Sequence, residues 1–300
     1  MEQLLLELLK NEGPLTGKDI VQKTGLETFK AWKTCRLDEN IATYVVGKRY
    51  LRLDQKVDRF ARLSPSIMRE FLNYTVIGLK EEEEAAVIKA DEITKAITSI
   101  SRNKFDLAKE AVARIIEQGI VSNTIAEDIV FIIAGDVVFN MAHAEPRPEV
   151  STGELVRGSD LDIIVVTEGI PASEVNLLDR LMYMEKYNLL VNPALKEELD
   201  YVVKDIETVK EQLQFCDFKG MVASKILDEG AYLYGSYDLY CRIKKLLKEH
   251  GISDKLSRLE EKAHRDRNEA EKTLLSAPET ACRDDLMLLF YTTEEKEEIF

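Results

Sequence analysis

Two aspartates directly before an apolar run carry the clearest chemistry in this sequence. Asp160 and Asp162 stand in the stretch RGSDLDIIVV, and because successive side chains of a strand point to opposite faces, these two carboxylates share one face. Two unpaired carboxylates at a buried strand repel each other and are costly to remove from water. We therefore expect a cation between them, and carboxylates without histidine favour Mg²⁺ held jointly with substrate phosphates.

Two further segments, IAGD at 133–136 and ELDYVV at 198–203, flank this pair. Together the three segments resemble the DNA polymerase beta-like nucleotidyltransferase superfamily. The fingerprint of that family is a strand ending in Gly-Ser, a helix, a strand bearing Asp-x-Asp, and a third carboxylate on a later strand. IAGD at 133–136 stands where the Gly-Ser would be, and SDLD at 159–162 supplies the Asp-x-Asp. ELDYVV at 198–203 offers Asp200 as the third carboxylate. The resemblance covers roughly residues 125–240.

The resemblance implies catalytic and metal-binding roles for Asp160, Asp162 and Asp200. The first two carboxylates would hold one Mg²⁺, or Mn²⁺ in its place, against the β and γ phosphates of a nucleoside triphosphate. Asp200 would orient a second ion or act as general base, and Glu198, on the same strand face, is its substitute. The implied reaction moves a nucleoside monophosphate to an unidentified acceptor hydroxyl and releases pyrophosphate.

The nucleotide is expected to contact residues of three segments, Gly135, Asp136, Arg157, Gly158, Ser159, Lys225 and Tyr234. Asp136 replaces the serine that helps to hold the triphosphate in the family, and a carboxylate there repels phosphate unless a metal bridges it or it turns away. Arg157 and the backbone amides that follow it offer replacement phosphate contacts. The loop is also longer than usual in the family, with 23 residues between Asp136 and Asp160, so a catalytically inactive member is an alternative.

The segment KILDEGAYLYGS at 225–236 follows the expected catalytic unit. Lys225 is expected to meet the triphosphate and Tyr234 to stack on the base. The competing interpretation is a core helix, since aromatic residues at helical spacing usually pack inside a protein.

Residues 1–78 have the pattern of a winged helix-turn-helix domain. Apolar periodicity, caps and glycine stops predict three short helices, and alternation about Gly47 predicts a β-hairpin over 42–54. The helix over 26–37 would be the recognition helix and the hairpin the wing. Contacts to DNA or RNA are expected from Lys30, Lys33, Arg36, Lys48 and Arg49. Winged helices also dock proteins, so a protein partner remains an alternative.

The patterns together predict an α+β chain in four parts. A helical connector over 79–124, with a second helix capped at Asn103, follows the winged helix domain. A nucleotidyltransferase α/β core with a mixed sheet is expected over 125–215, and a C-terminal helical domain over 216–300. The strands of the core are expected at 129–135, 160–166 and 198–206.

Composition excludes several classes of protein. The net charge of −14 over 300 residues argues against nonspecific polyanion binding by the whole chain, although residues 1–75 carry 13 Lys/Arg against 10 Asp/Glu. No apolar run reaches the roughly 18 residues of a membrane span, and the first residues lack the features of a signal peptide. A cytoplasmic protein without a membrane partner is expected. The cysteines and histidines lack metal-site spacing, so any metal should be oxygen-ligated.

Three classes of function remain open. The leading one is the Mg²⁺-dependent nucleotidyltransferase acting on a nucleoside triphosphate. The second is a DNA-binding transcriptional regulator whose catalytically inactive nucleotidyltransferase domain senses a nucleotide. The third is an antitoxin-like interaction protein. The sequence leaves the acceptor, the base preference and the oligomeric state open, a homo-oligomer included.

Overall fold

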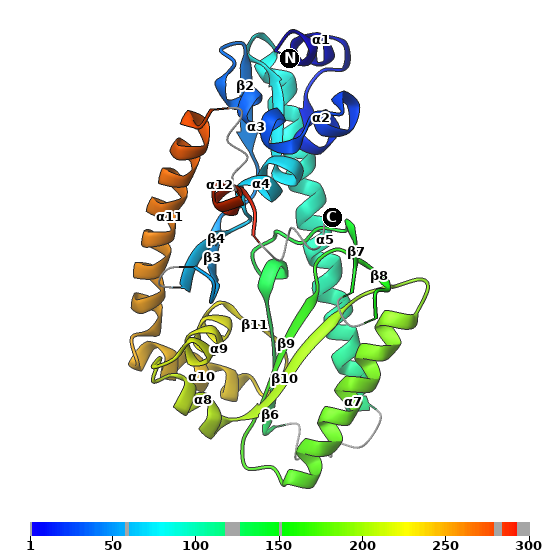
Figure 1. The fold of residues 1–300 in the computed structure, drawn as a ribbon. Helices are drawn as coiled ribbons and strands as arrows, with labels where there is room; N and C mark the ends of the chain where they lie inside the picture. The colour runs from blue at the N-terminus through cyan, green and yellow to red at the C-terminus, as the bar shows by residue number, and fades with distance from the viewer. Residues whose placement is uncertain (1, 58–59, 118–126, 150–151, 279–283, 293–300) are drawn as a thin grey trace. The chain divides into compact units, whose positions relative to one another are not determined.

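The chain is a mixed α and β protein built as two compact units (Figure 1). The computed structural model describes residues 2–57, 60–117, 127–149, 152–278 and 284–292. Helices make up 59% and strands 19%, which confirms the α+β class. The first unit comprises Met1–Ala96 with Leu259–Phe300, and the second comprises Ile97–Arg258. Within the described ranges, no helix combines the length and apolarity that a membrane span requires.

These units cut across the four segments expected from the sequence. Residues after 216 divide between the units, so the C-terminal helices do not form a domain of their own. The expected connector is one unbroken helix, α5 (Glu83–Glu117), without a new start at Asn103. Periodicity locates helices, whereas grouping into units depends on which apolar faces meet, and that information is not local.

The first unit begins with helices and short strands, and its elements run α1 (Glu2–Glu12), β1 (Leu15–Thr16), α2 (Gly17–Thr24), α3 (Thr28–Leu37), β2 (Ile41–Val45), β3 (Tyr50–Leu53), β4 (Ala61–Ser64), α4 (Ile67–Tyr74), β5 (Thr75–Leu79) and the 3₁₀ turn η2 (Lys80–Glu82). Thr16 and Asp19 form a reciprocal capping box that starts α2. Gly25, with φ of 66°, ends it in the left-handed conformation. The three short helices predicted here are therefore present.

The hairpin predicted over 42–54 is wrong. β2 pairs with β5, and β3 pairs with β4, so the strands on either side of Gly47 belong to different sheets. The three-stranded sheet has the order β1-β5-β2. The alternating apolar pattern identified both β2 and β3 as strands. However, β5 is buried along its whole length, so the rest of the unit covers it better than it covers β3, and β2 pairs with β5.

The core of the first unit includes the end of the chain. Trp32 of α3 lies 5.4 Å from Phe290, and Phe29 lies 5.3 Å from it, measured between ring centroids. Phe290 belongs to α12 (Asp284–Phe290), and Leu274 of α11 (Ile252–Ser276) joins the same cluster. Residues from both ends of the sequence therefore complete one apolar core.

The second unit is a four-stranded mixed sheet covered by helices. Its elements after α5 are β6 (Ile129–Ala134), the 3₁₀ turn η3 (Gly135–Val137), β7 (Pro146–Pro148), β8 (Leu155–Arg157), β9 (Leu161–Thr167), α7 (Ala172–Val191), β10 (Leu199–Asp205), α8 (Ile206–Gln212), α9 (Phe218–Glu229), β11 (Ala231–Gly235) and α10 (Tyr237–Glu249). The sheet order is β10-β9-β6-β11. β9 and β10 are parallel, and the other two pairings are antiparallel, which confirms the expected mixed sheet.

One face of this sheet is covered by α5 and α7. Ile133 of β6 and Ile163 of β9 pack there against Val112 and Leu178. Since side chains alternate, the neighbouring residues of each strand point to the other face, where α9 and α10 contact β6 and α8 contacts β10. Asp162 belongs to that second face.

Replacing Phe290 with alanine should destabilise the first unit although the residue lies near the end of the chain. Phe290 is 1% exposed, and removing a buried phenylalanine costs about 3–5 kcal/mol. Denaturant unfolding followed by the fluorescence of Trp32, the single tryptophan of the chain, measures the loss. Leu289→Ala is the matched control, because Leu289 is 41% exposed; equal effects of the two substitutions would refute this description of the core.

Candidate active site

The register of three strands assembles the expected carboxylates at one end of the sheet. Asp162 lies opposite Asp200 on β10 and opposite Ala134 on β6. Asp160 stands two residues before Asp162, immediately ahead of β9. The structure therefore brings together the three aspartates that the sequence singled out, beside the turn that follows β6.

Gly135 makes room for one of these carboxylates. Its φ is +72°, a conformation that other residues seldom adopt. A Cβ atom on Gly135 would lie 2.2 Å from Oδ2 of Asp162, so a side chain cannot be accommodated without moving that carboxylate. The backbone N–H of Gly135 donates a hydrogen bond to Oε1 of Glu229, at 3.4 Å. The turn therefore lies between a carboxylate of β9 and one of α9.

Asp136 turns toward the end of the long loop. The hydroxyl of Ser159 donates to Oδ2 of Asp136 at 2.9 Å, and the N–H of His143 donates to the Ser159 oxygen at 3.2 Å. Ser159 is buried. The carboxylate of Asp136 thus accepts a hydrogen bond from a serine of a different segment.

Arg147 holds two carboxylates, and nothing in its sequence surroundings predicted this. Its Nη2 lies 3.0 Å from Oδ1 of Asp160 and 2.8 Å from Oε2 of Glu198. Its Nε donates to the carbonyl oxygen of Gly158 at 2.9 Å. Arg147 belongs to β7, which pairs with β8. The sequence predicts only a loop over this segment, so the contact becomes evident only with the strand pairing.

Lys186 of α7 is a second cation that the sequence did not identify. Its Nζ lies 2.6 Å from Oδ1 of Asp200. Burial lowers the pKa of Lys186, but the hydrogen bond and the charge of Asp200, with the charge of Glu198, more than offset this effect and leave the pKa raised. The side chain therefore stays an ammonium beside the third carboxylate.

Glu198 is a buried carboxylate beside these aspartates. Burial raises its pKa, the charge of Arg147 opposes this, and the negative charges of Asp160 and Asp200 raise the pKa further. The net shift is upward. Glu198 therefore accepts a proton more readily than an exposed glutamate does.

The residues expected to replace the phosphate-binding serine lie on the β7–β8 hairpin and just after it. Arg157 of β8 is exposed, while its carbonyl oxygen accepts a hydrogen bond of 2.7 Å from Lys104. Gly158 has a φ of +63°, and a Cβ there would lie 1.9 Å from the carbonyl oxygen of His143. The close approach of two backbone segments explains the glycine at this position.

α9 brings Lys225 to the same end of the sheet. Its Nζ lies 2.5 Å from Oε2 of Glu229, the carboxylate that also accepts from Gly135, and 5.6 Å from the ring centre of Phe139. Burial raises the pKa of Glu229, and Lys225 partly counters this effect. Lys225 therefore lies close to the turn after β6.

The structure does not bring Tyr234 to this site. Tyr234 pairs with Phe131 and packs against the core between the sheet, α5 and α7, on the face opposite Asp162. The apolar packing of its ring decided its position, as the competing interpretation expected, but Tyr234 lies on the strand β11 and not on a core helix.

The donors at this end of the sheet are all oxygen atoms, the type that Mg²⁺ prefers. Asp160 immediately precedes β9, two residues before Asp162, and Asp200 is in register with Asp162. In the part of the chain that the structure describes, however, no group of three His, Cys, Asp or Glu side chains is arranged to hold a metal ion. Asp160 and Asp200 point to Arg147 and Lys186 instead. The carboxylate oxygens are therefore of the type that binds Mg²⁺, but Asp160 and Asp200 bind Arg147 and Lys186 of the same chain.

Three of the five residues expected to contact nucleic acid, Lys33, Arg36 and Arg49, contact other groups of the first unit. Lys33 donates to the carbonyl oxygen of Leu274 at 3.4 Å. Arg49 lies 2.5 Å from Glu70 and 3.1 Å from Glu271. Two further basic residues, Lys30 and Lys48, are exposed.

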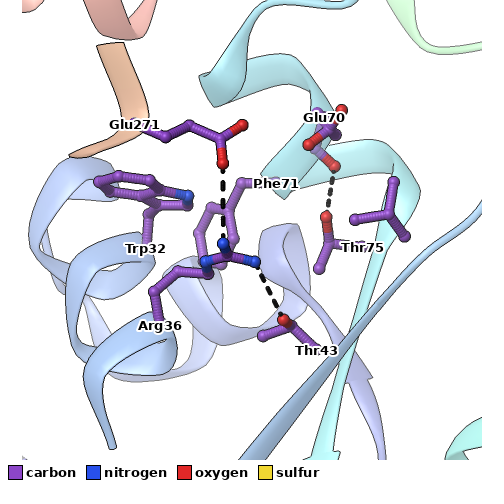
Figure 2. Close-up of a pocket in the computed structure, with 8 residues that line it drawn as sticks. Trp32, Arg36, Thr43, Glu70, Phe71, Thr75 and Glu271 are labelled. Atoms are coloured by element: carbon purple, nitrogen blue, oxygen red, sulfur yellow. Dashed lines mark hydrogen bonds and ion pairs between the residues drawn. The ribbon is translucent and has the colours of Figure 1, made fainter. Parts of the chain in front are cut away.

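Arg36 lies in a small pocket of the first unit, which Figure 2 shows with its lining side chains. Its Nη2 lies 3.6 Å from Oε2 of Glu271, and its Nη1 donates to Thr43 at 3.5 Å. Arg267 of α11 is buried, and its guanidinium lies 2.9 Å from Glu271 and 3.3 Å from Glu70. Three arginines, Arg36, Arg49 and Arg267, therefore neutralise two glutamates of the same unit.

Comparison with protein-family models and with curated proteins found no match for this chain. The fold and the site define a mixed α and β protein with a carboxylate cluster at one end of a four-stranded sheet. Function is therefore inferred from this geometry and from the chemistry of the residues that form it.

Substituting Gly135 with alanine should lower stability and displace the Asp162 carboxylate. A residue forced to a positive φ costs of the order of 1–3 kcal/mol, and the clash at 2.2 Å adds to this cost. Denaturant unfolding followed by circular dichroism measures the change. Gly169→Ala is the control, because Gly169 has a φ of +69° and open space around it. Equal losses in the two variants would show that Asp162 does not lie against Gly135.

Proposed function

We propose that the second unit is a Mg²⁺-dependent nucleotidyltransferase of the DNA polymerase beta-like type. It moves a nucleoside monophosphate from a nucleoside triphosphate to an acceptor hydroxyl and releases pyrophosphate. The observation that carries this proposal is the strand register, which sets Asp162 beside Asp200 and next to the glycine turn that ends β6. The pairing of the β9 and β10 strands was not part of the sequence motif, so it supports the proposal independently.

The three aspartates have separate roles in this proposal. Asp160 and Asp162 would hold the metal, which supplies charge neutralisation for the triphosphate and lowers the pKa of a bound hydroxyl. Asp200 would orient a second metal ion or accept the proton of the acceptor hydroxyl as its oxygen attacks the α-phosphorus. The new oxygen–phosphorus bond forms while the bond from the α-phosphorus to the bridging oxygen breaks, and pyrophosphate leaves with that oxygen.

The nucleotide phosphates are assigned to the turn after β6 and to the exposed Arg157. Lys225 lies near that turn through its pairing with Glu229, which contacts Gly135. A guanidinium, an ammonium and backbone amides at a turn are the groups that bind phosphate oxygens. Tyr234 has no part in this arrangement, because it packs on the opposite face of the sheet.

For the first unit we propose a winged-helix-type module. The order of its helices and the sheet β1-β5-β2 support this assignment, with β3, β4 and α4 inserted between the last two strands of the module. A nucleic-acid contact would use the exposed side chains of Lys30 and Lys48. Lys33, Arg36 and Arg49 contact other groups of the unit.

A second candidate is a nucleotide-sensing protein without turnover. Two observations favour it. Asp136 stands where the family has a phosphate-binding serine and is engaged by Ser159. Asp160 and Asp200 are paired with cations of the chain. Such a protein would bind a metal–nucleotide complex and leave it intact.

Asp162→Asn should abolish turnover while the fold persists. Removing this charge should reduce the rate by at least about 100-fold, the usual consequence of deleting one electrostatic contact to a transition state. Wild type and variant are compared for pyrophosphate release and for transfer of α-phosphate label from each of the four triphosphates, with Mg²⁺ or Mn²⁺ and with cell extract as a source of acceptors. Asp106→Asn, at an exposed position of α5, is the control for the change of charge.

The outcomes separate the candidate functions. Turnover that Asp162→Asn removes and Asp106→Asn leaves intact supports the enzyme. A wild type that binds nucleotide without releasing pyrophosphate supports the sensor. A wild type that neither binds nor converts any of the four triphosphates overturns both.

A further inference from the structure

Two cations from outside the Asp-x-Asp strand lie on the carboxylates assigned to the metal. Arg147 comes from β7 and binds Asp160 together with Glu198. Lys186 comes from α7 and binds Asp200. Arg147 and Lys186 thus bind Asp160 and Asp200, two of the three aspartates.

The two aspartates differ in exposure from a buried ion pair of the same unit, Lys104 with Glu197. Lys104 lies on Glu197 and also donates to the carbonyl oxygen of Arg157, and both side chains are at most 10% exposed. Asp160 and Asp200 are 38% and 49% exposed. Solvent and ions therefore reach the aspartates, whereas the Lys104 pair is a closed structural contact.

A divalent ion that binds Asp160 or Asp200 meets electrostatic repulsion from the cation already on that carboxylate. An ammonium 2.6 Å from an oxygen of Asp200 would repel an ion bound at the same oxygen, because like charges a few ångströms apart interact strongly at a partly buried site. A metal ion must therefore displace Lys186 and Arg147 from the aspartates. Once displaced, they need another anion, and a triphosphate supplies one.

We propose that Arg147 and Lys186 are built-in counter-cations that keep the carboxylates occupied in the metal-free protein and leave them for phosphate oxygens when metal and nucleotide bind. This inference rests on the proposed function, whose site it deepens. Metal binding and nucleotide binding are then coupled, because each ligand removes a cost that the other would otherwise meet. The site favours the metal–triphosphate complex over free metal.

The coupling predicts opposite changes in two affinities when either cation is removed: the affinity for metal alone rises, and the affinity for the metal–nucleotide complex falls. Lys186→Gln and Arg147→Gln keep much of the side-chain length and remove the charge. Binding of Mn²⁺ alone to the full chain is measured by electron paramagnetic resonance, and binding of a fluorescent ATP analogue is measured with Mn²⁺ present. Each variant should bind Mn²⁺ alone at least about fivefold more tightly, and the metal–nucleotide complex at least about fivefold more weakly, than wild type does.

Lys196→Gln is the matched control. Lys196 also pairs with a carboxylate, Glu154, in the same unit, so its loss changes the net charge equally without touching the three aspartates. Circular dichroism melting shows whether each variant is folded. A general charge effect would tighten Mn²⁺ binding equally in Lys196→Gln, and that result would overturn the inference.

The failures of the two proposals are distinguishable. If wild type turns over a triphosphate while Lys186→Gln and Arg147→Gln leave Mn²⁺ affinity unchanged or weakened, the inference falls and the proposed enzyme stands. If both variants gain Mn²⁺ affinity and lose nucleotide affinity while no triphosphate is converted, the inference about the counter-cations is supported and the proposed enzyme activity is refuted. If wild type and both variants bind no Mn²⁺, the inference falls.

Discussion

The parallel pairing of β9 with β10 is the constraint on which the acidic end of the sheet depends. It places Asp162 beside Asp200, and the antiparallel pairing of β9 with β6 adds the turn at Gly135. Side chains alternate along a strand, so a shift of one residue would turn Asp200 into the apolar face against α5 and α7. Burial of Ile163 on that face therefore fixes the register, and the register fixes the site.

Carboxylates gathered in this way need positive charge, and the fold supplies it from three separate elements. Arg147 arrives on β7, Lys186 on α7 and Lys225 on α9. Burial raises the pKa of Glu198 and of Glu229, and the nearby cations limit these shifts. The cluster is thus held by contacts between elements that are distant in the sequence, and each cation is suited in type to bind an anionic ligand.

The first unit uses its basic residues in a comparable way. Glu70 of α4 is buried, and a buried charge without a partner is costly. Arg49 and Arg267 lie on it, while Arg36 and Lys33 contact residues of α11 and the segment after it. A row of basic residues at helical spacing resembles a phosphate-binding surface, but here much of it stabilises the interior and edges of the unit. Charge pattern alone does not distinguish these two uses.

The sequence by itself determined the local features of this protein. Period-2 and period-3.6 patterns located β6, β9, β10 and most helices, and the Asp-x-Asp spacing placed two carboxylates on one face. These features follow from neighbouring residues. Only the tertiary structure decided which strands pair, since β2 joins β5 rather than β3, and which residues neutralise the aspartates. Partner choice depends on burial and charge balance summed over the folded chain, so residues such as Arg147 gave no local signal of their role.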